Sequence, residues 1–327
     1  MVKVSVVMIT YNHELYIKEA ILAVLAQKTN FEIELIVAND YSPDKTEFVV
    51  REIIDTHPKS NIIKYTRHTA NKGMMPNFIW AMEQCNGEYI ALCEGDDYWT
   101  DPHKLQKQVD FLEINRDFIL CFHPVKILKP NGQLTDDFIT YVPDNFEHFE
   151  NLANHGNYIH TPSVVFRNIL KSFPDEFLYS PIGDYFIYML LAQYGKIGRL
   201  DDTMSIYRYM SGIYSKLDEE EKKYKWLLTL LLLYSSYEKN KEIQGLILNQ
   251  IKSVMIPSLP HINQEQLAYI KSNKYTHDLV DKLILQQIKI LHKNQISNHT
   301  YEMLVIEIMN RGKRKITSLM HKLLFNG

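Results

Sequence analysis

The sequence predicts an α/β protein built on a mainly parallel sheet flanked by helices, followed by a C-terminal region made only of helices. In the first third of the chain, short apolar runs alternate with segments whose apolar residues recur at helical spacing. This alternation favours parallel strands, because parallel neighbours are joined by long crossovers that usually contain a helix. Near residue 216 glycine becomes rare, and leucine, lysine and glutamate take over. We therefore expect one domain over residues 1–215 and a helical region over residues 216–327.

Short apolar runs predict the strands. Strands of a parallel sheet are covered on both faces, so they are apolar throughout and lack the alternation of a half-exposed strand. The first third contains four such runs, at residues 4–9, 35–38, 62–65 and 88–93. Shorter strands are expected further along the chain, at residues 119–122, 163–166 and 204–209.

Segments with apolar residues on one side predict the helices that cover the sheet. In the first of them, Ala20, Ile21, Val24 and Leu25 share one face. Asp101 followed by Pro102 predicts the N-cap and the first residue of another helix. The helices of the first domain are expected at residues 14–27, 45–56, 76–85, 101–112 and 184–194.

In the C-terminal region, Pro257 and Pro260 are expected to interrupt the helices. Residues 227–233 are its most apolar segment. They are too few to span a bilayer, which predicts a buried helix.

The composition is that of a soluble globular protein. Of the 327 residues 46% are hydrophobic, and 36 basic residues nearly balance 39 acidic ones, which disfavours a nucleic acid as partner. Cys85, Cys93 and Cys121 lack the spacing of a disulfide framework or a zinc site. Because residues 4–9 fit a strand better than a signal peptide, we expect a cytoplasmic protein.

Polar residues follow three of the predicted parallel strands, at residues 10–12, 39–42 and 94–97. Ligands of such sheets bind at the carboxyl ends of the strands, so we expect these loops to meet. In the last of them Asp96 and Asp97 are adjacent, and two carboxylates on one turn repel each other unless a cation or strong donors lie between them. A metal ion that carries a phosphate substrate would satisfy this arrangement. The alternative is that one of them only closes an Asx turn.

Motifs in roughly the first 215 residues resemble, in order and approximate spacing, those of the family 2 glycosyltransferases, whose fold is called GT-A. The segments that carry the resemblance are residues 4–12, 35–46, 71–77, 87–99, 183–185, 195–198 and 207–208. Each motif alone is weak, whereas the series is strong evidence. The resemblance implies a nucleotide-binding half over about residues 1–100 and an acceptor half over about residues 101–215.

The resemblance also implies a reaction. A sugar would pass with inversion from a nucleotide donor, expected to be a UDP-sugar, to a hydroxyl of a glycan or lipid-linked glycan, in the synthesis of a bacterial surface polysaccharide. The alternative is a protein of the same fold that binds nucleotide-sugars without catalysis. Other nucleotide enzymes are disfavoured, because the first strand is followed by neither a Walker A sequence nor a glycine-rich, basic loop.

By the resemblance, the loop after the first strand holds the nucleotide through Thr10, Tyr11 and Asn12, with Tyr11 available to stack on a base. A helix-entry turn capped by Asn12 is the alternative, and the two roles are compatible. Asn71 and Gly73 resemble a loop that lines the base and the ribose.

Asp40 resembles the acid that accepts the imide N–H of uracil, a proton that thymine also offers and cytosine lacks. The family usually carries two acids here, and in this chain the first of them is Asn39. The alternative role for Asp40 is an Asx turn ahead of Ser42.

Asp96 and Asp97 match the family's metal-binding acids. The resemblance places Asp96 against the ribose or sugar and makes Asp97 a ligand of Mn²⁺ or Mg²⁺, ions that prefer carboxylate and phosphate oxygens. Asp184 resembles the general base that takes the proton of the acceptor hydroxyl. Its alternative role is to cap the helix that begins at Tyr185.

The chain departs from the family at Met210, where relatives often carry a histidine, and a thioether is a poor ligand for a hard cation. Arg208 is a candidate contact of the diphosphate, with a surface salt bridge as the alternative. Residues where relatives build the acceptor cleft are candidates for acceptor binding: Trp99, His160, Thr161 and Ser163. A tryptophan buried in the core is an equal alternative for Trp99.

Residues 311–322 contain five basic side chains, and apolar residues follow at helical spacing. This combination predicts a basic helix in peripheral contact with the inner face of the cell membrane, where a lipid-linked acceptor would lie. The alternative is a helix that docks on the core or on a second subunit, as in a homodimer.

Overall fold

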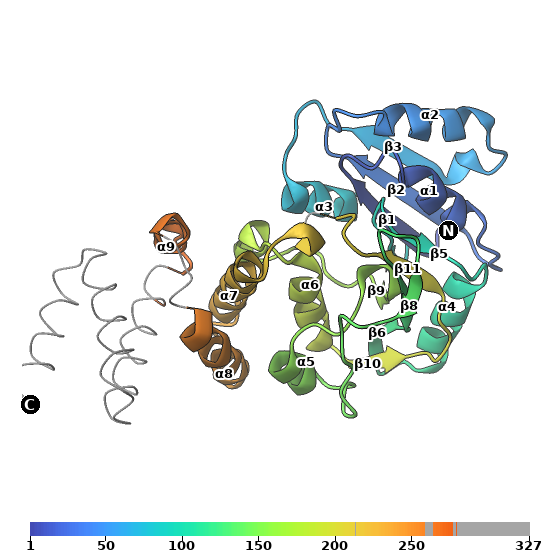
Figure 1. The fold of residues 1–327 in the computed structure, drawn as a ribbon. Helices are drawn as coiled ribbons and strands as arrows, with labels where there is room; N and C mark the ends of the chain where they lie inside the picture. The colour runs from blue at the N-terminus through green and yellow to red at the C-terminus, as the bar shows by residue number, and fades with distance from the viewer. Residues whose placement is uncertain (213, 259–263, 277–278, 280–327) are drawn as a thin grey trace, which may run out of the picture. The chain divides into compact units, whose positions relative to one another are not determined.

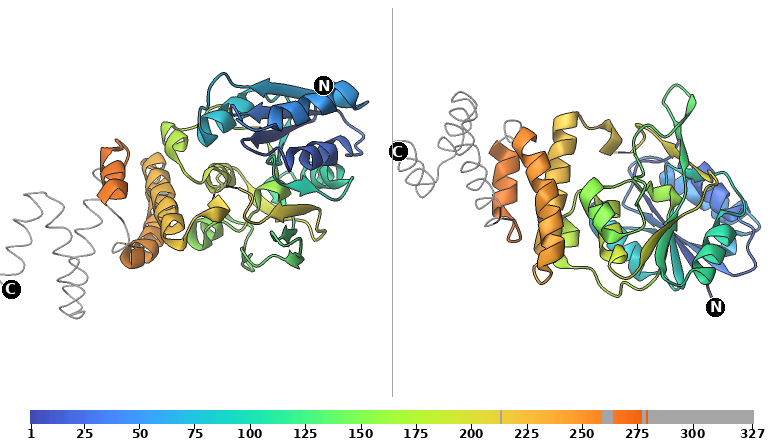
Figure 2. Two further views of the ribbon diagram at one scale, coloured as in Figure 1. Left: turned by 45° about the horizontal axis from the view of Figure 1, so that its top comes forward. Right: turned by 90° about the horizontal axis from the view of Figure 1, so that it is seen from below.

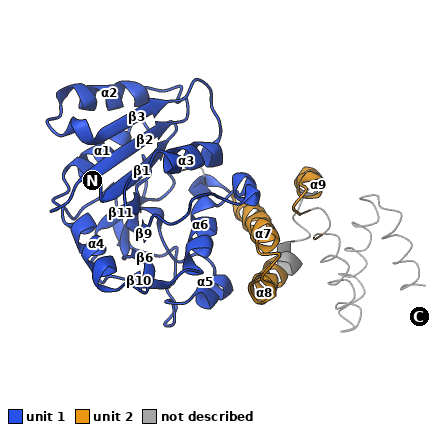
Figure 3. Cartoon of the chain, turned by 180° about the vertical axis from the view of Figure 1, so that it is seen from behind, with its two compact units in different colours: residues 1–217 blue, residues 218–327 orange. Residues whose placement is uncertain are grey.

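The protein is described by a computed structural model that covers residues 1–212, 214–258, 264–276 and 279. Its chain divides into two compact units, Met1–Leu217 and Asp218–Gly327 (Figure 3). The first unit contains two sheets and the helices packed on them (Figure 1). The second unit, as far as it is described, is helical.

The main sheet has seven strands in the order β10-β6-β9-β4-β1-β2-β3. Only β9 is antiparallel to its neighbours, so the predicted mainly parallel sheet is confirmed. The strands are β1 (Val4–Thr10), β2 (Ile33–Asn39), β3 (Ile63–Arg67), β4 (Tyr89–Leu92), β6 (Phe118–Phe122), β9 (Val165–Arg167) and β10 (Lys196–Arg199).

Helices cover both faces of this sheet, as the two views of Figure 2 show for the first unit. Alternate residues of a strand point to opposite faces, and Val4, Val6 and Met8 of β1 share one core with helices α1, α2 and α4. Helices α3 and α6 pack against the sheet as well, α3 on β1 and β2 and α6 on β6. The helices are α1 (Ile17–Leu25), α2 (Thr46–Thr56), α3 (Met74–Glu83), α4 (Lys104–Ile114), α5 (Phe149–His155) and α6 (Gly183–Ala192).

A second sheet of four short strands has the order β5-β11-β7-β8. Its central strand β11 runs antiparallel to β5 and parallel to β7. The sequence predicted only β11, because the other three are two to four residues long and carry mixed polar side chains. The strands are β5 (Tyr98–Trp99), β7 (Val125–Leu128), β8 (Leu134–Asp136) and β11 (Ser205–Arg208).

Two predicted helix starts were wrong, the first because of a hydrogen bond across the fold and the second because of local side-chain contacts. Helix α1 begins at Ile17 instead of Glu14, since the Glu14 backbone N–H donates to the Asp44 carboxylate across the fold. Helix α4 begins at Lys104, so Asp101 is not its N-cap. The Asp101 carboxylate instead accepts from the His103 backbone N–H and pairs with Lys107.

The second unit begins with α7 (Glu219–Ser236), where Asp218 accepts a hydrogen bond from the Glu221 N–H as N-cap. The apolar run Leu227 to Leu233 is buried, as predicted. Helix α8 (Lys241–Ser258) continues through Pro257, so the predicted break there was wrong; α9 spans Gln264–Ser272. Among the described helices, none has the length and apolar character needed to cross a bilayer. Pro260 and the predicted basic helix at residues 311–322 lie outside the described residues.

Lys104 is a buried cation in the core of the first unit. Its side chain is fully buried, its ammonium donates to Gln108 Oε1 at 2.7 Å, and it lies 4.2 Å from the centre of the Trp99 ring. Burial lowers the pKa of Lys104 from 10.5 to about 7. The folded protein therefore binds one proton fewer than the unfolded chain between these two pH values.

The free energy of unfolding of the wild type should rise between pH 7 and pH 10.5, because the cost of the buried ammonium is present in full below pH 7 and disappears as the lysine loses its proton. In Lys104→Met this rise should be smaller by on the order of 4 kcal/mol. Urea unfolding at a series of pH values measures the slope, with the exposed Lys28→Met as control. Parallel slopes in wild type and Lys104→Met would contradict the prediction.

Candidate active site

The acidic turn, residues 94–97, follows strand β4 and lies directly against the loop after β1. The Gly95 backbone N–H donates to the Ile9 carbonyl at 3.1 Å. A Cβ at Gly95 would come within 2.8 Å of His13 Nδ1 and Thr10 Oγ1, closer than real Cβ atoms approach. Glycine is therefore required there for the acidic turn to reach the β1 loop.

Both aspartates of the turn accept hydrogen bonds from residues far along the chain, Ser211 and Arg208. Asp96 is 5% exposed and accepts a hydrogen bond from Ser211 Oγ at 2.8 Å. Asp97 is 1% exposed, and its Oδ1 accepts from the backbone N–H of Arg208 at 2.8 Å. The alternative of a simple Asx turn is therefore wrong. Strand β11, which ends at Arg208, is one wall of this site.

The second oxygen of Asp97, Oδ2, is buried and has no hydrogen-bond partner. Burial, together with the neighbouring charge of Asp96, raises the pKa of Asp97 well above its usual range. A buried carboxylate oxygen without a donor is a suitable ligand for a cation, which would restore its ionised form.

No cluster of three or more histidine, cysteine or acidic side chains arranged to hold a metal occurs among the described residues. Side chains of this part of the protein alone therefore do not form a closed metal cage. Mg²⁺ is commonly bound by one or two carboxylates, with substrate phosphates and water completing its sphere. The residues present fit an ion of that kind, with Asp97 as the protein ligand.

Asp184 lies in the first turn of α6 and belongs to the same group of acids. Its Oδ1 accepts from the Tyr185 N–H at 2.7 Å, and its Oδ2 accepts from Asn157 Nδ2 at 2.9 Å. Burial raises the pKa of Asp184. Burial also raises the pKa of Glu94 to about 8, and the charges of Asp96 and Asp184 add to this increase. Because α6 already begins at Gly183, the alternative of Asp184 as N-cap is wrong.

The loops predicted to hold the donor are connected by hydrogen bonds. Asp40 is 3% exposed, and its carboxylate accepts from the backbone N–H groups of Lys72 at 2.7 Å and Gly73 at 2.9 Å. Its own N–H donates to the Thr10 carbonyl at 3.0 Å. Asn71 Oδ1 also accepts from the Gly73 N–H, at 2.9 Å.

The Asx contact that was the alternative role for Asp40 is made by its neighbour Asn39, whose Oδ1 accepts from the Ser42 N–H at 2.9 Å. Two further contacts join the donor loops to the proposed base and to each other. A Cβ at Gly183 would come within 2.7 Å of Met75 Sδ, so the start of α6 lies against the start of α3, close to Gly73. The Asn12 N–H donates to Ser42 Oγ at 3.1 Å.

Backbone strain is concentrated in the loops of this region. Asn12, Tyr41 and Met210 have left-handed φ angles of 59°, 60° and 67°, which residues other than glycine rarely adopt. They follow the carboxyl ends of β1, β2 and β11. Such residues gather at binding and catalytic sites, where surrounding contacts hold them in place. Asn12 is not a helix cap, because α1 begins only at Ile17; Tyr11 before it is half-buried.

The side chain of Arg208 is engaged away from the acids. Its guanidinium pairs with Glu19 and lies 5.1 Å from the centre of the Tyr16 ring and 4.7 Å from that of Tyr98. The structure thus has the ion pair that was the alternative to a diphosphate contact, and the Arg208 backbone N–H donates to Asp97 of the acidic turn.

Two of the predicted acceptor residues, Trp99 and Ser163, are buried in this structure. Trp99 is 4% exposed, and its indole N–H donates to the Pro162 carbonyl at 2.9 Å. Ser163 is fully buried, and its hydroxyl donates to the His160 carbonyl at 2.7 Å. Thr161 is half-buried at the start of a short 3₁₀ turn, Thr161–Ser163.

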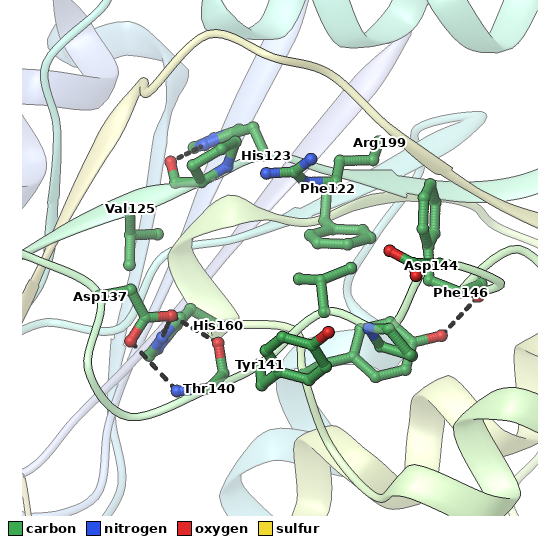
Figure 4. A pocket seen from close by; sticks show the side chains of 14 residues that line it. Phe122, His123, Val125, Asp137, Thr140, Tyr141, Asp144, Phe146, His160 and Arg199 are labelled. Carbon is green, nitrogen blue, oxygen red and sulfur yellow. Dashed lines mark hydrogen bonds and ion pairs between the residues drawn. The ribbon is translucent and has the colours of Figure 1, made fainter.

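His160 lines a cavity of about 400 Å³ (Figure 4), in which its Nε2 lies 2.9 Å from Asp137 Oδ2. The residues that line this cavity include none of the acidic turn and none of the predicted donor residues.

Sequence reasoning missed side chains that touch these acids. His13 Nε2 lies 4.0 Å from Asp96 Oδ2, and burial lowers the pKa of His13. His13 directly follows Asn12 and Glu94 directly precedes Gly95, so their positions in the predicted site loops could have identified both as site residues. Ser211 contacts Asp96, and Asn157 contacts Asp184. Both pairs are far apart in the sequence, and no local sequence pattern predicts either contact.

Comparison with known proteins adds independent information. The family model described as Glycosyl transferase family 2 matches residues 5–173. An uncharacterized protein of Mycobacterium tuberculosis strain H37Rv is 35% identical over 223 residues, which are 67% of this chain and 63% of that protein. An uncharacterized glycosyltransferase of Nostoc sp. is 30% identical over 213 residues, 63% of this chain and 64% of the relative. The chain thus spans less than two thirds of the length of these relatives.

Solved structures show the same fold. S. aureus TarS 1–349 in complex with UDP superposes with a TM-score of 0.53 at 17% identity, covering 84% of this chain and 93% of that one. The Pyrobaculum calidifontis mannosyltransferase PcManGT in complex with GDP-Man and Mn²⁺ gives a TM-score of 0.53 at 15% identity, covering 98% and 79%. At these identities the likeness establishes the fold alone, which confirms the predicted GT-A architecture.

Proposed function

The chain belongs to glycosyl transferase family 2, and from this membership we propose that it transfers a sugar from a nucleotide donor, with UDP as carrier, to a hydroxyl of a glycan or lipid-linked glycan. We place this reaction in the synthesis of a cell-surface polysaccharide. The observation that carries the proposal is the unpartnered, buried Oδ2 of Asp97, next to Asp96 and in the same acidic group as Asp184. Structural neighbours in complex with UDP and with GDP-Man and Mn²⁺ support a nucleotide-sugar donor.

The donor would lie across the linked loops of Thr10, Asp40 and Gly73. The contacts of the Asp40 carboxylate with two backbone N–H groups hold the β2 loop and residues 71–73 together, which supports a base and ribose site there. Asp96, held in place by the hydrogen bond from Ser211, would accept a hydrogen bond from a hydroxyl of the ribose or the sugar. Asp97 would ligate Mn²⁺ or Mg²⁺, an ion that offsets the charge on the departing diphosphate when bound.

Asp184 is the proposed general base. Its carboxylate takes the proton of the acceptor hydroxyl while the oxygen bonds to the anomeric carbon and the bond from that carbon to the diphosphate oxygen breaks. Attack opposite the leaving group inverts the anomeric centre. Asn157 and the Tyr185 N–H orient the carboxylate, and its raised pKa makes it a stronger base than a solvent-exposed aspartate.

A melting-temperature screen tests the proposal. We expect one nucleotide-sugar, with UDP as its nucleotide, to raise the melting temperature in the presence of Mn²⁺ and to do so much less in EDTA, because a ligand that binds only the folded state stabilises it. Slow release of UDP from that donor in the absence of acceptor would distinguish an enzyme from a protein that only binds nucleotide-sugars. No shift with any nucleotide-sugar would contradict the proposal.

A further inference from the structure

The cavity lined by His160 and Arg199, called the Arg199 pocket below, is linked to strand β11 through His160. Alternate residues of a strand face opposite sides, and Tyr207 and Tyr209 flank Arg208. The Tyr207 ring lies 5.0 Å from that of His160, and the Tyr209 ring lies 5.4 Å from that of Phe138. The same stretch, through the Arg208 N–H, holds Asp97. Strand β11 therefore contacts the acidic turn through Arg208 and one residue of the pocket wall, His160, through Tyr207.

A second connection runs through residues 157–160. Asn157 donates to the Asp184 carboxylate, while Tyr158 and His160, on the same short segment, line the pocket. Consecutive Cα atoms are about 3.8 Å apart, so His160 lies within roughly 11 Å of Asn157 along the chain. A ligand in the pocket would thus lie close enough to the proposed base for an attached sugar to reach it.

The walls of the pocket combine aromatic rings with unpaired charges (Figure 4). Phe122 and Tyr158 are buried beneath it, and Tyr141 at its edge is 77% exposed. Arg199 and Asp144 are both exposed, and among the described residues neither side chain has an ion pair or hydrogen bond. An arginine and an aspartate that line one cavity without pairing are available to a ligand.

The polar groups of the pocket favour a ligand with several hydroxyls. The Asp144 carboxylate can only accept hydrogen bonds and the Arg199 guanidinium can only donate them, so together they suit hydroxyls, which do both. Asp137 is already engaged by His160 and Thr140. His123 adds no positive charge, because burial lowers its pKa well below the usual range. Its Nδ1 lies 2.8 Å from the Pro124 carbonyl and must therefore carry the proton. The two free charges of the pocket, Asp144 and Arg199, have opposite signs, which favours an uncharged ligand over an anionic one.

We propose that the Arg199 pocket binds an uncharged sugar ring of the acceptor glycan, next to the unit that receives the new sugar. The apolar face of the ring would stack on Tyr141, and its hydroxyls would donate to Asp144 and accept from Arg199. The proposal rests on the proposed function and adds to it the site and the chemical class of the acceptor. It predicts that a uronate or a phosphate binds at this position more weakly than an uncharged sugar.

Saturation-transfer NMR with methyl glycosides of neutral hexoses and N-acetylhexosamines tests the pocket directly. We expect at least one neutral glycoside to bind, and the methyl glycoside of glucuronic acid to bind more weakly. Arg199→Ala and Tyr141→Ala should each weaken binding of the neutral glycoside about fivefold to tenfold, the effect of about one lost hydrogen bond or stacking contact. Both side chains are exposed, so both variants should fold.

Arg116→Ala, which removes an exposed arginine elsewhere in the first unit, is the matched control and should bind like the wild type. Binding of UDP with Mn²⁺, measured as a rise in melting temperature, reports separately on the proposed function. If UDP binds but no glycoside does, or if glycosides bind equally to Arg199→Ala, or if the uronate binds best, the pocket proposal is wrong. If UDP does not bind while the neutral glycoside depends on Arg199, the pocket stands and the donor proposal is wrong.

Discussion

Asp97→Asn should abolish metal-dependent donor binding and reduce sugar transfer by at least about 100-fold, since a bound metal stabilises the transition state by several kcal/mol and each 1.4 kcal/mol is tenfold in rate. The substitution keeps the oxygen that accepts from the Arg208 N–H but removes the charge and replaces the unpartnered oxygen by an amide. Titration of UDP binding against Mn²⁺ in the wild type and the variant measures the effect.

The fold of Asp97→Asn should survive. The wild-type carboxyl has a raised pKa because it is buried beside Asp96, so its ionised form is a cost to the empty protein, and a neutral amide does not carry that cost. Asp117→Asn, at a carboxylate that is 59% exposed, is the control and should retain full Mn²⁺ dependence. Mn²⁺-dependent UDP binding at wild-type strength in Asp97→Asn would remove Asp97 from the metal site.

Asp184→Asn should reduce transfer by about 10²–10⁴-fold, the usual contribution of a general base, while UDP and Mn²⁺ bind as in the wild type. The variant has one side-chain oxygen where Asp184 uses two, for Tyr185 and Asn157, so a small loss of stability is expected as well. Parallel measurements of turnover and of UDP affinity separate the two effects. Turnover near the wild-type rate would show that another group takes the proton.

The pH profile offers a sharper test of the same base. In the wild type kcat/KM should fall as the pH drops through the raised pKa of Asp184, because the protonated carboxyl cannot accept the acceptor's proton. The hydrogen bond from Asn157 lowers this pKa, so Asn157→Ala should move the acidic limb of the profile to higher pH. A loss of activity in Asn157→Ala with an unmoved profile would mean that Asn157 has only a structural role.

The sequence was sufficient where the chain is locally periodic or fully apolar. The runs that became β1, β2 and β4 are apolar because both faces are covered, and the stripe of Ala20, Ile21 and Val24 marks the core face of α1. The convergence of loops followed from one rule, that parallel strands end at the same edge, and the contacts of Gly95 with Thr10 and His13 agree with it.

Long-range contacts set the features that the sequence did not predict. The direction of β9 depends on its pairing with both β4 and β6. The role of Trp99 was ambiguous in the sequence, because an indole suits a sugar site and a core equally well. In the structure its N–H donates a hydrogen bond to the Pro162 carbonyl, which fixes the ring in the core. Likewise, nothing near Arg208 in the sequence indicates Glu19 as the partner of its guanidinium.

One continuous stretch, residues 137–146, supplies seven of the fourteen residues that surround the Arg199 pocket. The loops that would grip the nucleotide come from other parts of the chain altogether. Substitutions confined to residues 137–146 would therefore alter half of the pocket lining and leave the donor loops unchanged, whereas Arg199 and His160 lie outside this stretch. A library of variants randomised at residues 137–146 would be a starting point for changing the acceptor sugar that the protein binds.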